Sequence, residues 1–216
     1  RIDARIDHEV VGVDLDRRTV EVRAIGQGRT IAMGFDLLHI ATGARPTRPD
    51  LPGIDAPWIR GVQTLTDAAD LLERVERGDC GRVVVVGGGY VGLEMAEAFV
   101  DRKADVTLVE RGQHPLGGVE SEIGGRIVEV LRGYGVETHC GVEVTGFGDH
   151  VVHSSGGDLE ADLVILGLGV TPNSALAADA GIATGVRGAI TVDHRQRTSV
   201  DGVYSAGDCA DTFHLV

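Results

Sequence analysis

Three short apolar runs predict buried strands of a parallel sheet. They are Val83 to Val86, Val106 to Val109 and Leu163 to Leu168, and glycines or charged residues bound each of them. Strands that are apolar at every position, rather than at every second one, are typical of a sheet covered on both faces. The pattern therefore predicts an α/β protein.

Segments with a helical period lie before and between these runs. A helix is expected from the glycines after Val86 to about Lys103, and another from about Glu122 to Tyr134. A third is expected over Asp67 to Arg77, with Thr66 as its N-cap and Gly78 beyond its end. The apolar stripes on these helices indicate packing against the sheet.

The first and last parts of the chain have the pattern of shorter strands. Partial alternation predicts a three-stranded meander, then a more buried strand and an irregular stretch with four prolines over residues 45 to 60. Near the other end, Asn173 is expected to cap a short helix that reaches about Ala180. The remaining strand predictions are Glu9 to Val13, Thr19 to Arg23, Arg29 to Met33, Asp36 to Ala41, Val136 to Val144, Val151 to His153, Ile190 to Val192 and Val203 to Ser205.

The turn after the valine run has the glycine spacing of a dinucleotide site. Gly87 permits a tight turn, Gly89 lets the backbone approach a pyrophosphate, and Gly92 lets the helix lie close to the strand. The start of the helix offers free N–H groups to the anion. A glycine-rich chain can match this spacing by chance, so the valine strand before it and the helix after it carry the argument.

An acid and a further glycine turn extend this candidate site. Glu110 ends the strand that follows the helix, where it would accept hydrogen bonds from the adenosine ribose, and a carboxylate there favours NADH over NADPH. Gly169 follows the buried Leu163 to Leu168 strand, and ligands of open α/β sheets lie beyond such strand ends. We expect Gly169 to border the nicotinamide ribose. An ordinary glycine-rich turn in a strand–helix–strand unit remains the alternative.

Composition and charge narrow the function classes. The chain has 216 residues, 43% of them hydrophobic, and a formal net charge of −13, which disfavours nucleic acid or an anionic membrane as a partner. Its longest apolar run is too short to span a bilayer and no leader precedes Arg1, so a soluble protein is expected. Three dispersed cysteines form no C-x-x-C pair, which predicts a reducing cytoplasm and no metal site.

Three segments together resemble one family. They are the turn Ala41-Thr42-Gly43-Ala44-Arg45-Pro46, the glycine unit with its continuation Gly92-Leu93-Glu94-Met95-Ala96-Glu97-Ala98, and the tail Val203-Tyr204-Ser205-Ala206-Gly207-Asp208-Cys209. In this order and spacing they resemble the FAD-dependent pyridine nucleotide-disulfide oxidoreductases. The GLEMAEA run is most similar to the branch of coenzyme A-disulfide reductase, NADH oxidase and NADH peroxidase.

The resemblance implies a Rossmann-like, doubly wound NAD(H)-binding domain inserted in a partial FAD-binding domain. Residues 79–191 would bind NAD(H), and residues 1–78 and 192–216 would be the two pieces of the FAD domain. By the same resemblance Tyr90 gates the nicotinamide pocket and Glu94 points toward the flavin. The implied FAD contacts are Thr42, Gly43, Gly207, the backbone near Val10, and Asp208, whose carboxylate would bond a ribitol hydroxyl.

The resemblance also implies parts that this sequence does not contain. Members of the family begin with a glycine motif for FAD, carry a redox cysteine soon after it, and end in a dimerisation domain. That cysteine is expected upstream of Arg1, so no catalytic residue is assigned to Cys80, Cys140 or Cys209. The longer parent chain is expected to be a homodimer.

The sequence therefore predicts a flavoprotein that passes hydride from NADH to FAD and on to a disulfide, peroxide or oxygen. The partner would be a small-molecule or disulfide acceptor. Two alternatives stay open: a reductase that supplies electrons to a ferredoxin or rubredoxin, and a non-catalytic NAD(H)-binding module.

Overall fold

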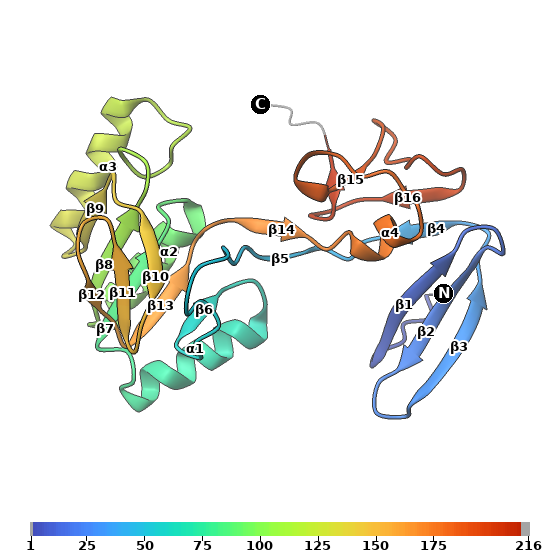
Figure 1. The fold of residues 1–216 in the computed structure, drawn as a ribbon, viewed down its shortest axis with the longest axis horizontal. Coiled ribbons are helices and arrows are strands. Elements are labelled where there is room, and N and C mark those ends of the chain that lie inside the picture. Colours follow the sequence, from blue (N-terminus) through green and yellow to red (C-terminus); the bar gives the residue numbers. More distant parts are fainter. Residues whose placement is uncertain (1, 213–216) are drawn as a thin grey trace. The chain divides into compact units, whose positions relative to one another are not determined.

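A computed structural model describes residues 2–212, which form two compact units (Figure 1). One unit spans Pro46–Val170, and the other combines the residues up to Arg45 with those from Thr171 onward. No helix in the described part of the chain is long and apolar enough to cross a membrane.

The Pro46–Val170 unit is built on a five-stranded parallel sheet. The strand order is β6-β13-β7-β8-β9. The strands are β6 (Ile59–Gly61), β7 (Arg82–Val86), β8 (Asp105–Glu110), β9 (Glu137–Cys140) and β13 (Leu163–Leu166). The chain runs from β7 outward to β8 and β9, then returns to place β13 on the other side of β7. Such a reversal of strand order opens a crevice at the carboxyl ends of the strands, where ligands bind in this architecture.

Alternate residues of the buried strands face two different layers. Val83 and Val85 pack with three helices, α1 (Leu65–Arg77), α2 (Tyr90–Asp101) and α3 (Ser121–Gly133). Val84 and Val86 pack instead with Trp58, Phe147 and their neighbours. Val83 to Val86 and Leu163 to Leu166 are apolar at every position because each of their two faces is covered.

The second face of the sheet carries strands instead of helices. It is covered by an antiparallel sheet of β10 (Val144–Phe147), β11 (Val151–Ser154) and β12 (Leu159–Glu160). The α/β class with a parallel sheet is as predicted. The layer that a doubly wound arrangement would fill with helices is formed by this hairpin and its third strand, because the β9–β13 connection contains only short alternating segments.

The other unit contains the predicted meander. Strands β1 (His8–Asp14), β2 (Thr19–Ala24) and β3 (Arg29–Gly34) form an antiparallel sheet. A parallel pair joins β4 (Leu38–Ile40) to β16 (Val203–Ser205), and another joins β15 (Ile190–Thr191) to β17 (Ala210–Asp211). Ile40, Ile190, Val203 and Cys209 share one core with the short helix α4 (Ala175–Asp179).

The boundaries of the units differ from the expected domain limits of 79–191. The unit with the parallel sheet starts at Pro46, because β6 pairs with β13 and α1 packs on the same core as α2. It ends at Val170, because Ala177, Ile182 and Ile190 are buried in the other unit's core. Two short paired strands, β5 (Ala44–Pro46) and β14 (Val170–Pro172), contain both boundaries, so β5 and β6 are regular elements within a stretch expected to be irregular.

Two predicted caps are wrong. Helix α1 begins two residues earlier than expected, with Thr64 as N-cap in a capping box with Asp67, so Thr66 lies inside the helix. Ser174, not Asn173, precedes α4, and the Asn173 amide donates to the Thr42 carbonyl oxygen at 3.1 Å. In both places the sequence offers two nearby capping residues. The local capping box with Asp67 selects Thr64, and the long-range bond to Thr42 engages the Asn173 side chain away from α4.

Candidate dinucleotide site

The turn between β7 and α2 has room only for glycine at two of the predicted positions. Gly87 adopts φ 101°, which favours glycine. A Cβ on Gly92 would lie 1.9 Å from the Gly87 carbonyl oxygen, and a Cβ on Gly87 would lie 2.6 Å from that of Gly167. Helix α2 can therefore start against the ends of β7 and β13 only because side chains are missing here.

The start of α2 is free to bind an anion. Gly89 is its N-cap, and no side chain bonds the first N–H groups of this 12-residue helix. Unsatisfied N–H groups and the positive end of the helix dipole favour a phosphate at this position. The backbone around Gly89 is open, since an added Cβ would approach nothing closer than 3.7 Å.

The carboxylate of Glu110 lies at the same edge of the sheet and holds two turns together. Its Oε2 accepts the Gly88 N–H at 2.6 Å, and its Oε1 accepts the Gly112 N–H at 2.5 Å. The carboxylate thus joins the turn after β7 to the loop after β8. Because each carboxylate oxygen has a second lone pair, both can still accept a ribose hydroxyl.

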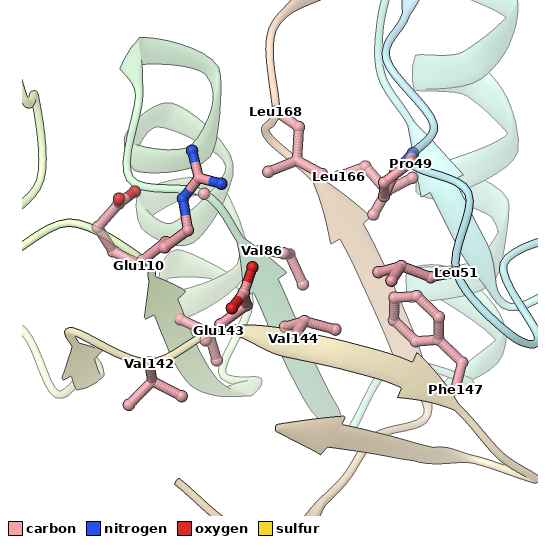
Figure 2. Close-up of a pocket in the computed structure, with 13 residues that line it drawn as sticks. Pro49, Leu51, Val86, Glu110, Val142, Glu143, Val144, Phe147, Leu166 and Leu168 are labelled. Carbon is pink, nitrogen blue, oxygen red and sulfur yellow. The ribbon is translucent and has the colours of Figure 1, made fainter. Parts of the chain in front are cut away.

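A pocket of about 280 Å³ opens beside Glu110, beyond the carboxyl ends of β7, β8 and β13 (Figure 2). In Figure 2 the apolar side chains Pro49, Leu51 and Phe147 gather at one side and Glu110 lies at the other. The residues that line it are Pro49, Leu51, Val86, Gly87, Val109, Glu110, Arg111, Val142, Glu143, Val144, Phe147, Leu166 and Leu168. Apolar walls with a few polar groups are typical of cofactor pockets.

Three other predicted residues lie outside this pocket lining. Tyr90 is 77% exposed on the first turn of α2. Glu94 is exposed and lines a different hollow, between α2 and α3. It lies on another face of α2 than the buried Gly92. Gly169 follows the pocket residue Leu168, adopts φ 77° and has open space where a Cβ would be.

Four of the five candidate FAD residues of the other unit lie beyond the carboxyl ends of one pair of parallel strands. Ile40 pairs with Ser205 at the ends of the parallel strands β4 and β16, so Thr42 and Gly43 follow one strand and Gly207 and Asp208 follow the other. Gly43 and Gly207 both adopt positive φ and both have open space beside them. Asp208 is exposed, and Val10 is a half-exposed residue of β1.

Cys209 connects these two turns. Its Sγ lies 3.4 Å from the Ser205 hydroxyl and 3.6 Å from the Ile40 carbonyl oxygen. Burial alone would raise the pKa of this thiol, but hydrogen bonds from Ser205, Thr42 and the Gly43 backbone lower the pKa below its usual value. The thiol is fully buried, so it fixes the turns and is closed to a bulky substrate.

Sequence reasoning missed most of the pocket wall. Val142, Glu143, Val144 and Phe147 come from β10 and the chain before it, and Pro49 and Leu51 come from the proline-rich stretch. No glycine motif marks these residues. Arg111 could have been noticed, because it follows directly after the predicted ribose acid.

The whole chain, residues 1–216, matches the family model for pyridine nucleotide-disulphide oxidoreductases. The chain belongs to this family. It is 36% identical over its full length to the NAD(P)H sulfur oxidoreductase (CoA-dependent) of Pyrococcus furiosus, of which it covers 49%. It is 32% identical to the rhodocoxin reductase of Rhodococcus erythropolis, over 97% of this chain and 49% of the relative.

A solved structure agrees with this membership. The NAD-dependent persulfide reductase of A. fulgidus superposes with a TM-score of 0.91 at 33% identity, over 96% of this chain and 39% of the other. The chain thus spans about half the length of the curated relatives it matches. The predicted family and its α/β class are confirmed.

Proposed function

We propose that this chain forms the nucleotide-handling part of an FAD-dependent NAD(P)H oxidoreductase. Hydride would pass from the nicotinamide to the flavin and on to a disulfide, persulfide, peroxide or oxygen. One observation carries the proposal. The glycine turn, the uncapped start of α2 and the Glu110 carboxylate lie together at the carboxyl ends of the parallel strands, with an apolar pocket beside them. The cofactors supply the redox chemistry, and the chain holds and orients them.

Each predicted residue has a role in this proposal. The N–H groups at the start of α2 hold the pyrophosphate, and Glu110 holds the adenosine ribose. Nucleotide binding is assigned to the Pro46–Val170 unit rather than to residues 79–191, and FAD binding to the other unit. Tyr90, Glu94 and Gly169 are assigned to the nicotinamide and flavin side, and Val10, Thr42, Gly43, Gly207 and Asp208 to FAD.

The three cysteines present do not supply the redox thiol of this reaction. Burial raises the pKa of Cys80 and of Cys140, which disfavours the reactive thiolate in both. Cys209 is fully buried. A disulfide or persulfide acceptor would therefore react at a thiol outside these 216 residues, or at the flavin.

A sulfur acceptor is the first choice and a redoxin the second. The sulfur oxidoreductase and the persulfide reductase both match nearly the whole chain, which favours a small sulfur compound. The match to a rhodocoxin reductase is the observation that keeps the second choice. Steady-state rates with a coenzyme A persulfide and with a small redoxin, under the same NADH, distinguish them.

The proposal includes a cytoplasmic location and a homodimeric parent chain. Its three cysteines are free thiols, as a reducing cytoplasm would keep them. The parent chain is proposed to be a homodimer, which sedimentation of the full-length protein would test.

An NADH titration of the chain, followed in the visible flavin band after incubation with FAD, tests the central claim. With FAD in excess, because the chain alone is expected to hold it weakly, we expect NADH to bleach the band without air and admitted oxygen to restore it. Binding of NADH is followed in parallel by fluorescence transfer from Trp58, the one tryptophan. NADH binding without bleaching would leave a nucleotide-binding module, and absence of NADH binding would refute the proposed site.

A further inference from the structure

Asn173 lies directly after β14, and each of its polar atoms bonds the turn that follows β4. Its backbone N–H donates to the Gly43 carbonyl oxygen at 2.9 Å, and its carbonyl oxygen accepts the Thr42 hydroxyl. Its side-chain Nδ2 donates to the Thr42 carbonyl oxygen at 3.1 Å, and its Oδ1 accepts from the Arg45 guanidinium at 3.2 Å. A residue 131 positions away in the sequence therefore holds both the side chain and the carbonyl group of Thr42.

The side-chain bonds of Asn173 add to an ordinary strand pairing. Strands β5 and β14 pair with each other, and the bond from the Asn173 N–H to Gly43 continues that pairing. The amide side chain reaches one residue further, to Thr42, which backbone pairing alone does not do. Because a guanidinium can only donate, Arg45 faces Oδ1 and leaves Nδ2 for the Thr42 carbonyl oxygen. The partners thus determine which way the amide points.

The chain just before the turn is held from β16. The Ser205 hydroxyl donates to the Ile40 carbonyl oxygen at 3.0 Å, and Ser205 is fully buried. Strand β16 therefore fixes the end of β4, and Asn173 fixes the residues that leave it. Without Asn173, the turn would be held only where the strand ends.

The turn needs this second anchor because Gly43 does not fix its own conformation. Gly43 adopts φ 66°, and glycine enters this region about as readily as the others. Nothing lies within 4 Å of a Cβ added to Gly43 or to Gly207, and the two turns follow neighbouring parallel strands, so a nucleotide cofactor such as FAD fits here. A turn that is already ordered loses less conformational entropy when a ligand binds.

We propose that Asn173 is a positioning residue for FAD, whose side-chain amide holds the turn at Thr42 and Gly43 in the conformation that accepts the cofactor. Asn173 acts through the Thr42 carbonyl group and does not itself contact FAD. The inference rests on the proposed function, because it takes the turn after β4 to be an FAD contact. It gives a task to a residue that the sequence pattern marked only as a helix cap.

Three variants of the chain test the proposal. Asn173→Ala removes both side-chain bonds, whereas Asn173→Asp keeps the acceptor for Arg45 and loses the donor to Thr42. Ser174→Ala is the matched control, because this neighbouring buried hydroxyl donates to the Gly188 carbonyl oxygen and not to the turn. Each chain is titrated with excess FAD, followed by flavin fluorescence anisotropy and the visible absorption band. Urea unfolding and NADH titration are measured in parallel.

Both Asn173 variants are expected to weaken FAD by about 2- to 10-fold, the range for one lost hydrogen bond. At saturating FAD their visible band should resemble that of free flavin more than the wild-type band does. Hydrogen exchange of residues 41–46 without FAD should be faster in both. Ser174→Ala should lower stability but leave FAD affinity and the bound spectrum unchanged, and NADH affinity should be the same in every chain.

Other results overturn the inference. If the wild-type chain binds FAD and Asn173→Ala binds it equally well, Asn173 does not position the turn. If Asn173→Asp keeps the wild-type affinity that Asn173→Ala loses, the bond to Arg45 is the important one. If Ser174→Ala weakens FAD as much, the effect is a general loss of stability. A wild-type chain that binds NADH but no FAD would instead refute the FAD part of the proposed function, and the inference with it.

Discussion

At the scale of single residues, the candidate site depends on side chains that are absent as much as on those present. Gly92 and Gly87 allow α2 to begin against the strand ends, and Glu110 then joins the two neighbouring loops through backbone bonds. In the proposed function, one acid and two glycines create both the pyrophosphate position and the ribose position. Each can be tested separately from the redox reaction.

Gly92→Ala is expected to destabilise the chain and abolish nucleotide binding. The new methyl group would lie 1.9 Å from the Gly87 carbonyl oxygen, so the helix must shift, at a cost of about 1 to 3 kcal/mol of unfolding free energy. Urea unfolding and NADH titration measure the two effects. Gly125→Ala on α3, where an added Cβ has open space, is the control and should stabilise by about 0.5 to 1 kcal/mol. A Gly92→Ala chain as stable as wild type would contradict the close-contact argument.

At the scale of elements, the ends of helices and strands are set by bonds between residues far apart in the sequence or by a choice between neighbours. Helix α1 uses Thr64 and Asp67 as a capping box although Thr66 stands two residues later. Strand β7 is joined to the chain before β13 by Asp162, which accepts the Arg82 backbone N–H at 2.8 Å. These bonds fix the start of α1 and the amino ends of β7 and β13, which lie at the opposite ends of these strands from the pocket.

Thr64→Ala is expected to lower the unfolding free energy by about 1 kcal/mol, because the N–H of Asp67 loses its side-chain acceptor. Thr66→Ala is the matched control. It should be neutral or slightly stabilising, since alanine is the better residue inside a helix. Chemical denaturation of both variants decides between the two caps, and a larger loss for Thr66→Ala would contradict the assigned helix start.

Asp162 should make stability depend on pH. Hydrogen bonding from Arg82, with its charge, lowers the pKa of this carboxyl below its ordinary 3.8. A lowered folded-state pKa means that the stabilisation is present above 3.8 and is lost as the pH falls through the lower value. Asp162→Asn should therefore lower the unfolding free energy near neutral pH. It should also make the unfolding free energy depend less on pH in the acid range.

Urea unfolding of Asp162→Asn from pH 7 down to pH 2 checks this, with Asp149→Asn, in the turn between β10 and β11, as a control for an exposed carboxylate. Two parallel stability curves for wild type and Asp162→Asn over this range would refute the assignment.

At the scale of the whole molecule, the two compact units differ in how well their sheets are covered. The Pro46–Val170 unit has a five-stranded sheet with a layer on each face. In the other unit, the described residues form parallel sheets of two strands each beside the meander. Small parallel sheets with open edges are weak alone, because such strands are normally buried on both faces.

The 216-residue chain expressed by itself is expected to bind NADH well and FAD weakly. The proposed nucleotide site lies within one well-packed unit, whereas the candidate FAD turns follow the two-stranded β4–β16 sheet. Gel filtration of the chain loaded with FAD, followed by a visible spectrum, measures flavin retention. Near-stoichiometric flavin after filtration would show this expectation to be wrong.

The sequence by itself determined the elements that depend on local pattern. The valine strand, the glycine turn and the helix after it are adjacent in the chain, so their geometry follows from spacing, glycine backbone freedom and helical period. The same holds for the meander. The acid at Glu110 was found because it ends the next strand, and the family was identified from three such local motifs together.

Only the tertiary structure decided what completes the pocket. Part of its wall comes from segments far away in the chain, which contribute Phe147, Leu51 and Glu143. A local sequence pattern cannot predict such contacts, because they depend on how distant segments pack. The same applies to the β10–β12 layer on the second face of the sheet. It applies also to Glu110, whose two backbone bonds depend on where the Gly88 and Gly112 amides point after folding.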